Sequence, residues 1–293
     1  MILEKKIPLR YWFGMIKWDL LIVTLFSSII SIASLYFKIY VPLTIGVFLG
    51  TTIALLLSFK LSQSYDRWWE ARKIWGSIVN DSRSLVLQLK NYSQNAPELV
   101  RSMGLRQIAW CYALANALRH LDAKDNLAGF VNADELKELD KQYNVPLALL
   151  NSQSRELAIL HRQKAINDYQ QVQLDSTLVR LAASMGMAER IKNTAFPKTY
   201  RATLHIFIYV FLFLLSMSLT ELHSLIEVPI DILIAIPFFV LDKIAFYIQD
   251  PFENRPTDTP MTSISRNIEI NIKQILGEPD IPEPIKPETF YVM

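Results

Sequence analysis

The sequence predicts an all-α membrane protein, with four transmembrane helices per subunit that are continuous with a cytoplasmic helical domain. Three observations predict this class. Hydrophobic residues make up 51% of the chain and charged residues 20%, a mixture between that of a soluble domain and that of a chain wholly in lipid. The apolar residues gather in two pairs of long runs. The stretch between these pairs has few glycines and spaces its apolar residues as a helix does.

The first pair of runs occupies residues 20–60, after an N-terminal segment (1–19) that we expect in the cytoplasm. Leu20–Tyr36 is uncharged and rich in branched and aromatic side chains, so a helix of about 1.5 Å rise per residue, extended by its flanks, crosses a hydrocarbon core. The second run begins near Pro42, a residue suited to the first turn of a helix. It carries no charge until Lys60.

The second pair occupies residues 201–249. Its runs are Ile206–Thr220 and Val228–Phe246. Asp242 and Lys243 stand near the end of the last run. Because adjacent residues on a helix point about 100° apart, we interpret them as boundary charges that contact water or a neighbouring helix, rather than as a functional pair.

The distribution of lysine and arginine predicts a multi-pass protein of the cell membrane with both termini in the cytoplasm. Basic residues flank the start of the first run and the end of the second, whereas the segment 221–227 has none and the turn after the first run has only Lys38. Short loops rich in basic residues stay on the cytoplasmic side. The flanking basic residues are Lys5, Lys6, Arg10, Lys17, Lys60, Arg67, Arg72 and Lys73.

We expect residues 61–200 to form the cytoplasmic helical domain. One helix ends in a Ser-Gln-Asn-Ala-Pro turn, Pro97 opens the next, which runs through Leu118, and a short solvated helix covers Glu135–Lys141. The remaining residues, 250–293, form a cytoplasmic tail rich in proline with one amphipathic stretch, Ile264–Leu276. We expect this tail to wrap over a neighbouring subunit in extended form.

Several function classes lack the residues they need. A net charge of +2 without a basic stripe excludes nucleic acid as an expected partner. The single cysteine, Cys111, lies in an apolar helical run and forms neither a disulfide framework nor a thiolate metal cluster. The histidines share no metal-ligand spacing, and no phosphate-binding, dinucleotide or metalloprotease motif is present. We therefore expect no enzyme activity, no metal and no cofactor.

The segment after the second run resembles the signature of the bestrophin family, particularly its bacterial branch. Shorter stretches support the resemblance, namely Gly186 to Ile191 with Pro197, Asp250-Pro251-Phe252-Glu253 and Asn254 to Pro260. The match covers essentially the whole chain, with the same four-span plan. The residues of the signature are Tyr65, Asp66, Arg67, Trp68, Trp69, Glu70 and Arg72.

The resemblance implies a homopentamer around a central pore that conducts small inorganic ions across the lipid bilayer. By position, the narrow neck falls on Thr51, Leu55 and Phe59, whose i, i+4, i+8 spacing makes one stripe of a helix. Apolar rings offer an ion no replacement for its hydration shell. Thr51 departs from the family's apolar neck, so we expect the tightest barrier at Leu55 and Phe59.

The family's lower constriction falls on Tyr169, in a loop before a helix that we expect to start near Gln173. A shift of one residue would select Asp168 or Gln170 instead. Apart from the resemblance, a tyrosine before a helix is usually a packing residue, and the neck stripe fits plain helix packing or lipid contact as well.

Animal members of the family bind calcium with consecutive acidic residues after the motif that reads Asp-Pro-Phe here. Those positions hold Asn254 to Thr257 in this chain, which leaves Glu253 and Asp258 as scattered carboxylates, and Arg255 would repel a divalent cation. Calcium gating is therefore not expected.

The leading functional hypothesis is a passive ion channel, with anions such as chloride as the family's default and a monovalent cation as an open alternative, because the neck residues are neutral. A second hypothesis is a membrane-anchored helical scaffold whose pore does not conduct. A secondary transporter is disfavoured, since neither inverted repeats nor matching glycine-interrupted helices are evident.

Overall fold

The computed structural model describes residues 7–37, 41–194, 198–221, 224–287 and 290–291. Lys5, Lys6, Lys38 and Pro197 lie outside these residues. The described part is almost entirely helical, with nine α-helices and a 3-10 turn, η1 (Leu219–Glu221). The helices are α1 (Leu9–Ser34), α2 (Leu43–Tyr92), α3 (Pro97–Leu118), α4 (Ala133–Leu139), α5 (Val145–Arg162), α6 (Asp168–Asn193), α7 (Lys198–Ser218), α8 (Ser224–Gln249) and α9 (Met261–Leu276).

The chain divides into two compact units. Unit 1 comprises residues 1–3, 69–194 and 250–293, and unit 2 comprises residues 4–68 and 195–249. The boundary passes through α2, so this one helix contributes its first half to unit 2 and its second half to unit 1.

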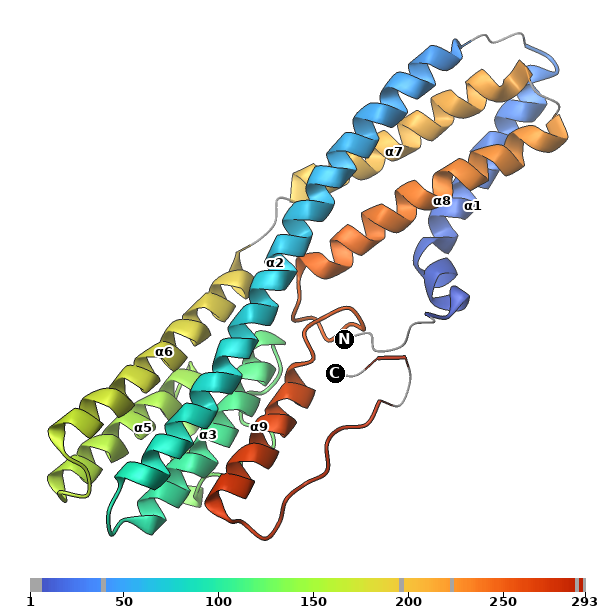
Figure 1. The fold of residues 1–293 in the computed structure, drawn as a ribbon. Helices are drawn as coiled ribbons and strands as arrows, with labels where there is room; N and C mark the ends of the chain where they lie inside the picture. The colour runs from blue at the N-terminus through green and yellow to red at the C-terminus, as the bar shows by residue number, and fades with distance from the viewer. Residues whose placement is uncertain (1–6, 38–40, 195–197, 222–223, 288–289, 292–293) are drawn as a thin grey trace. The chain divides into compact units, whose positions relative to one another are not determined.

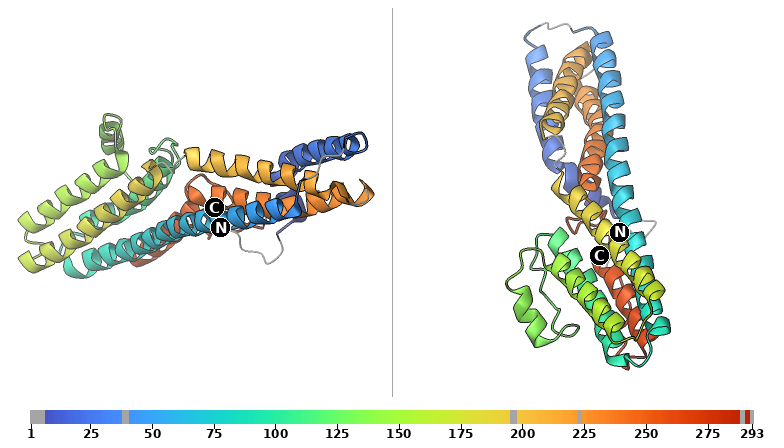
Figure 2. Two further views of the ribbon diagram at one scale, coloured as in Figure 1. Left: turned by 90° about the horizontal axis from the view of Figure 1, so that it is seen from above. Right: turned by 90° about the vertical axis from the view of Figure 1, so that its left-hand side faces the viewer.

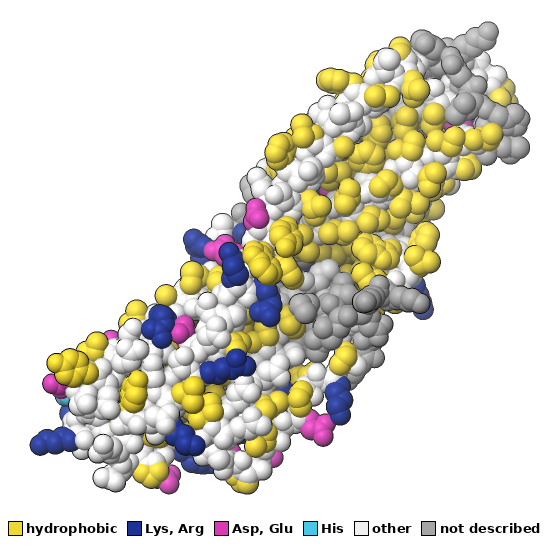
Figure 3. All heavy atoms as spheres, viewed as in Figure 1, with side chains coloured by type: hydrophobic (Ala, Val, Ile, Leu, Met, Phe, Trp, Pro, Cys, Tyr) yellow, Lys and Arg dark blue, Asp and Glu magenta, His cyan; other side chains and the backbone are white. Residues whose placement is uncertain are grey.

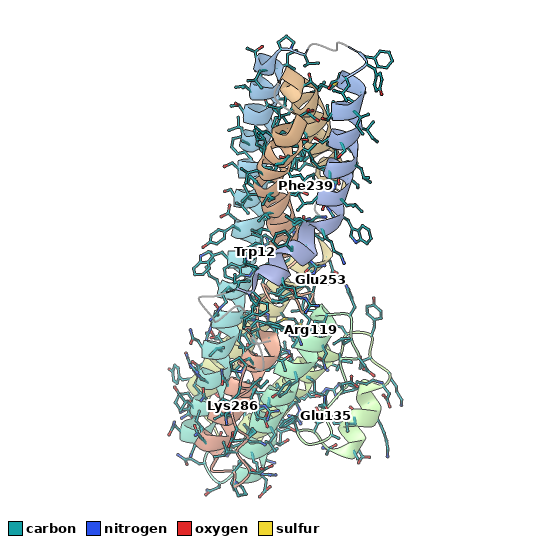
Figure 4. The ribbon with its side chains drawn as sticks, turned by 90° about the vertical axis from the view of Figure 1, so that its right-hand side faces the viewer. Trp12, Arg119, Glu135, Phe239, Glu253 and Lys286 are labelled. Atoms are coloured by element: carbon teal, nitrogen blue, oxygen red, sulfur yellow. The ribbon has the colours of Figure 1, made fainter. Side chains whose placement is uncertain are left out.

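Unit 2 packs α1, the first half of α2, α7 and α8 into a bundle of roughly parallel and antiparallel helices (Figures 1 and 2). Its core includes Val23 of α1, Ile53 of α2, Ile208 of α7 and Phe239 of α8, and Phe239 lies inside the bundle (Figure 4). A Cβ atom on Gly50 would lie 3.0 Å from the Phe211 ring. Glycine at this position therefore permits the close approach of α2 to α7.

Among the residues that the structure describes, three helical segments are long and apolar enough to cross a membrane. They are Leu9–Ser34, Leu43–Tyr92 and Thr199–Ser218. The fourth predicted span coincides with α8, which is 26 residues long and contains Pro229 and Pro237, but it is not among the three.

Unit 1 is built around α3, which packs against α5 and α9, while α5 also packs against α6. Its large core includes Trp75 of α2, Trp110 and Leu114 of α3, and Ile268 of α9. The guanidinium of Arg106 is also buried, where it binds both oxygens of Glu135 at 2.6 and 3.0 Å and Glu156 at 2.7 Å. Burial lowers the pKa of Arg106, but the hydrogen bonds that Arg106 donates to the two glutamates outweigh it and raise that pKa.

Several predicted elements of unit 1 are confirmed. Helix α3 has the predicted bounds, α4 overlaps the predicted short helix, and α9 contains the amphipathic stretch of the tail. Cys111 is buried, and desolvation raises its pKa to about 12. The predicted start of the next helix near Gln173 is wrong, because α6 begins at Asp168.

The earlier start of α6 has a local cause. The Asn167 side chain accepts a hydrogen bond from the Gln170 backbone N–H at 2.9 Å, and the Gln170 side chain accepts one from the Asn167 N–H at 2.9 Å. This reciprocal capping box satisfies two backbone donors that the helix itself leaves open. Tyr169 therefore lies in the first turn of α6 and not in a loop.

Candidate pore-lining face and buried charge network

Helix α2 presents two different faces within unit 2. Ile53, Leu57 and Lys60 are buried against the rest of the bundle. Residues 51, 55 and 59 lie on the opposite side of the helix, since successive residues turn by about 100°, and all three side chains are exposed. The predicted neck residues therefore share one face that the chain itself does not cover.

This exposed face is chemically neutral. Leu55 is 58% exposed and Phe59 57%. The Thr51 hydroxyl donates a hydrogen bond to the Val47 carbonyl at 2.8 Å, so its proton is engaged within its own helix. Hydrophobic side chains also gather over α2, α7 and α8 on the face of unit 2 seen in Figure 3. Such a surface can meet lipid, a second copy of the chain or a narrow dewetted passage.

Beneath that face, Lys60 forms a buried ion pair with α8. Its Nζ atom lies 2.6 Å from Oδ1 of Asp242, and both side chains are almost completely shielded from solvent. The other oxygen of Asp242 lies 3.0 Å from Nδ1 of His205 on α7. This carboxylate thus joins three helices.

The network continues from His205 to α1. Nε2 of His205 lies 3.3 Å from Oδ1 of Asp19, and the Tyr209 hydroxyl donates to the same oxygen at 2.8 Å. Lys243 reaches the second oxygen of Asp19 at 3.1 Å. Both ring nitrogens of His205 face carboxylates, an arrangement that uses two N–H donors. Two acids, two lysines and one histidine therefore tie together all four helices of unit 2.

The signature motif occupies one uninterrupted stretch of α2. The rings of Tyr65 and Trp68 stack with their centroids 5.9 Å apart, and Glu70 pairs with Arg190 of α6. Tyr65, Asp66 and Trp69 are exposed, whereas Arg67, Trp68, Glu70 and Arg72 are partly buried. The motif thus provides both exposed aromatic rings and a charged contact to α6.

The Asp-Pro-Phe-Glu motif forms a turn that holds a lysine of α6. Lys192 binds Asp250 at 3.0 Å and Glu253 at 2.6 Å, while Phe252 is fully buried. Burial lowers the pKa of Lys192, but Glu253 and Asp250 outweigh it and raise that pKa. Lys192 and Arg255 supply positive charge on both sides of Glu253. Within the described residues no group of three or more acids, histidines or cysteines is placed to hold a metal.

The sequence model of the family described as bacterial/fungal bestrophin proteins matches residues 13–274. The chain belongs to this family. The match includes most of α1, the whole of α2, α7 and α8, and most of unit 1.

Three relatives of this bestrophin have a named function or a solved structure. The voltage-dependent anion channel-forming protein YneE of Escherichia coli (strain K12) is 30% identical over 276 residues, which cover 93% of this chain and 90% of that protein. The crystal structure of a bacterial bestrophin homologue from Klebsiella pneumoniae is 26% identical, covers 89% of this chain and 98% of its own, and superposes with a TM-score of 0.86. A further anion channel-forming protein, RSc3414 of Ralstonia nicotianae, is 26% identical over 254 residues.

Sequence reasoning missed the charge network of this bestrophin. The sequence predicts Lys60 as a flanking charge and Asp242 as a boundary charge in contact with water or a neighbouring helix. The structure buries both side chains and pairs them across two helices. Lys243 pairs with Asp19 instead of its chain neighbour. The available signal was an ionisable residue inside a long apolar run, which marks a site where a partner is required. The sequence does not show which partner, because the pairs join residues on different helices.

Tyr169 and the predicted neck residues belong to different units of the chain. Tyr169 belongs to unit 1, its side chain is 88% exposed, and it follows Asp168, whose carboxylate lies 2.7 Å from His161. An exposed ring in the first turn of a helix is free to contact another chain. The Tyr169 side chain is therefore accessible to solvent or to another chain, and its place in a constriction stays a prediction.

Proposed function

We propose that this bestrophin forms a homopentameric channel that passes small inorganic anions through a central pore. The exposed face of α2 lines the neck of that pore, and Thr51, Leu55 and Phe59 supply three stacked rings. The observation that carries this proposal is the contrast between the two faces of α2, one packed in unit 2 and one apolar and uncovered.

The proposed subunit crosses the membrane four times. Helices α1, α2 and α7 have the length and hydropathy of spans, and α8 packs along α1 and α7 in the same unit, which supports a fourth crossing. An even number of crossings places both termini on one side, and the basic residues that flank α1 and α2 favour the cytoplasm. The tail beyond α9 would then contact a neighbouring subunit.

Anion conduction is supported by the curated relatives, which are described as anion channel-forming proteins. The neutral neck favours neither sign of charge. In unit 1, Glu70 and Asp81 are neutralised by Arg190 and Arg180, so these acids present no strong barrier to an anion. Selectivity for a monovalent cation is the alternative, and flux measurements distinguish it from anion selectivity.

The decisive experiment measures ion flux into liposomes that carry the purified full-length protein, with chloride and sodium gradients imposed separately. We expect chloride flux to exceed sodium flux. Leu55→Ala should raise the flux, because shortening a ring of leucine widens and wets an apolar constriction. The matched control is Leu25→Ala, since Leu25 is a leucine of α1 with 56% of its surface exposed, and its flux should equal that of the native chain.

Three outcomes would contradict parts of this proposal. Larger sodium than chloride flux would reverse the selectivity, and equal flux in Leu55→Ala and the native chain would remove Leu55 from the gate. Absence of flux in every variant would favour the membrane-anchored scaffold. Chemical crosslinking in mild detergent checks the assembly separately, since a ladder that stops at five subunits is expected.

A further inference from the structure

Two acidic side chains of α8 are buried in unit 2 outside the charge network. Glu227 and Asp231 are 1% and 0% exposed, respectively. They are separated by four residues, so they project from the same face of α8 one turn apart. Helix α8 packs along α1 (Figures 1 and 2). Both acids therefore lie within the bundle and not on its surface.

These acids lack the partners that other buried acids of unit 2 possess. Neither oxygen of Asp231, nor Oε1 of Glu227, has a hydrogen-bond partner among the described residues. Neither acid forms an ion pair with a lysine, arginine or histidine in that part of the chain. Asp242, on the same helix, is bound by both Lys60 and His205. Helix α8 therefore carries one compensated acid, Asp242, and two uncompensated ones, Glu227 and Asp231.

The groups around the two acids are hydroxyls. Asp231 lies beside Ser27, and Glu227 lies beside Ser31, both on α1. Ser27 is fully buried and its Oγ atom lies 3.0 Å from Oγ of Ser216 on α7. The cluster thus combines two carboxylates and three hydroxyls from three helices, with oxygen as its only donor element.

This composition calls for a positively charged ligand. An ionised carboxylate buried without a counter-charge is strongly disfavoured in a membrane-spanning bundle, and two of them one turn apart repel each other. A proton held by one acid leaves a single negative charge to compensate. Sets of carboxylate and hydroxyl oxygens suit hard cations.

We propose that Asp231, Glu227, Ser27 and Ser31 bind a monovalent cation of about the size of sodium inside unit 2. The site joins α1 to α8 and uses no residue of the exposed α2 face. It is therefore a bound structural ion, distinct from any ion that the proposed pore conducts. Its occupancy should stabilise the bundle, because the cation binds the folded arrangement of the helices and not the separated helices.

The test measures thermal unfolding of the purified full-length protein in detergent at pH 8. Choline chloride is replaced stepwise by sodium chloride at constant total salt, so that ionic strength and chloride stay fixed while the cation changes. Choline is too large for a cluster of buried side chains. We expect the unfolding midpoint to rise by about 2–4 °C at a sodium concentration of about ten times Kd.

Two variants and one control assign the response to this site. Asp231→Asn and Glu227→Gln keep the side-chain size and remove one ionisable carboxyl group each, so the variant that replaces the charged acid should lose the rise with sodium. Glu98→Gln, at an exposed acid of α3 in unit 1, should retain it. The native chain is informative by itself if a variant fails to fold.

Equal midpoints in sodium and choline for the native chain would overturn the proposal. A retained sodium response in both variants would also overturn it. So would a stability that depends on pH in the same way at every sodium concentration, since protons alone would then compensate the acids. None of these readouts depends on ion flux. The cation site and the channel can therefore fail independently.

Discussion

The two units of this bestrophin arrange polarity in opposite ways. In unit 1, apolar side chains such as Trp75, Trp110 and Leu114 are buried, and many charged pairs such as Lys124–Asp140 lie at the surface. In unit 2, apolar side chains such as Leu25 are exposed, and the pair Lys60–Asp242 is buried. Figure 3 shows the same contrast, with charged side chains spread over unit 1 and hydrophobic ones over unit 2.

The contrast indicates that the surrounding solvent, water or lipid, determines which side chains each unit buries. Water drives apolar groups inward, whereas lipid is as apolar as the side chains and supplies no such force. In a lipid environment the polar contacts between helices carry a larger share of specificity, because an ionisable group has no partner outside the bundle. The charge network of unit 2 therefore adds specific polar contacts to the apolar core of that unit.

The largest expected effect comes from breaking the Lys60–Asp242 pair. Lys60→Ala leaves Asp242 with only His205 as a cationic partner, so we expect a loss of about 3–5 kcal/mol in the free energy of unfolding. The comparison is Lys124→Ala, which removes an exposed pair of unit 1 and should cost less than about 1 kcal/mol. Thermal unfolding in detergent measures both. Equal losses would show that burial does not set the strength of these pairs.

A second comparison concerns apolar residues, for which the larger loss of stability is expected in unit 1. Leu114→Ala, in the core of unit 1, should lower the free energy of unfolding by about 2–5 kcal/mol because it leaves a cavity. Leu25→Ala, on the surface of unit 2, should change it by less than about 0.5 kcal/mol. Chemical denaturation followed by circular dichroism gives both values. A large loss for Leu25→Ala would place that side chain in an interface between copies of the chain.

The third comparison concerns a buried acid of unit 1. Asp258 is fully buried, and desolvation raises its pKa from 3.8 to about 6. The folded state then binds more protons than the unfolded state between these values, so this residue's contribution to stability falls as pH rises from about 4 to about 6. The full change corresponds to about 3 kcal/mol.

Replacing Asp258 isolates that pH dependence. Asp258→Asn retains an acceptor for the Arg255 N–H, which bonds Oδ2 of Asp258 at 2.9 Å, but it does not ionise. The variant's stability relative to the native chain should therefore increase from pH 4 to pH 7, as measured by unfolding midpoints across that range. If the difference in stability between the variant and the native chain stayed constant with pH, ionisation of Asp258 would not affect stability.

Much of the architecture was predictable from local patterns. Pro97 and the polar turn before it fixed the start of α3, and the periodicity of Ile264, Ile268 and Ile272 indicated α9. The predicted start of α6 is too late, because the capping box formed by Asn167 and Gln170, whose residue types are visible in the sequence, begins the helix at Asp168. The roles of Thr51, Leu55, Phe59 and Tyr169 remain predictions that flux measurements test.

The sequence by itself determined the helical class, the apolar runs and the family signature, because each depends on residues near one another along the chain. Only the tertiary structure decided that Lys60 meets Asp242, that His205 bridges to Asp19, and that Asp231 has no such partner. These outcomes depend on the rotation of each helix about its axis and on which helix lies beside it. Hydropathy measures neither quantity, since apolar residues surround a membrane helix on every side.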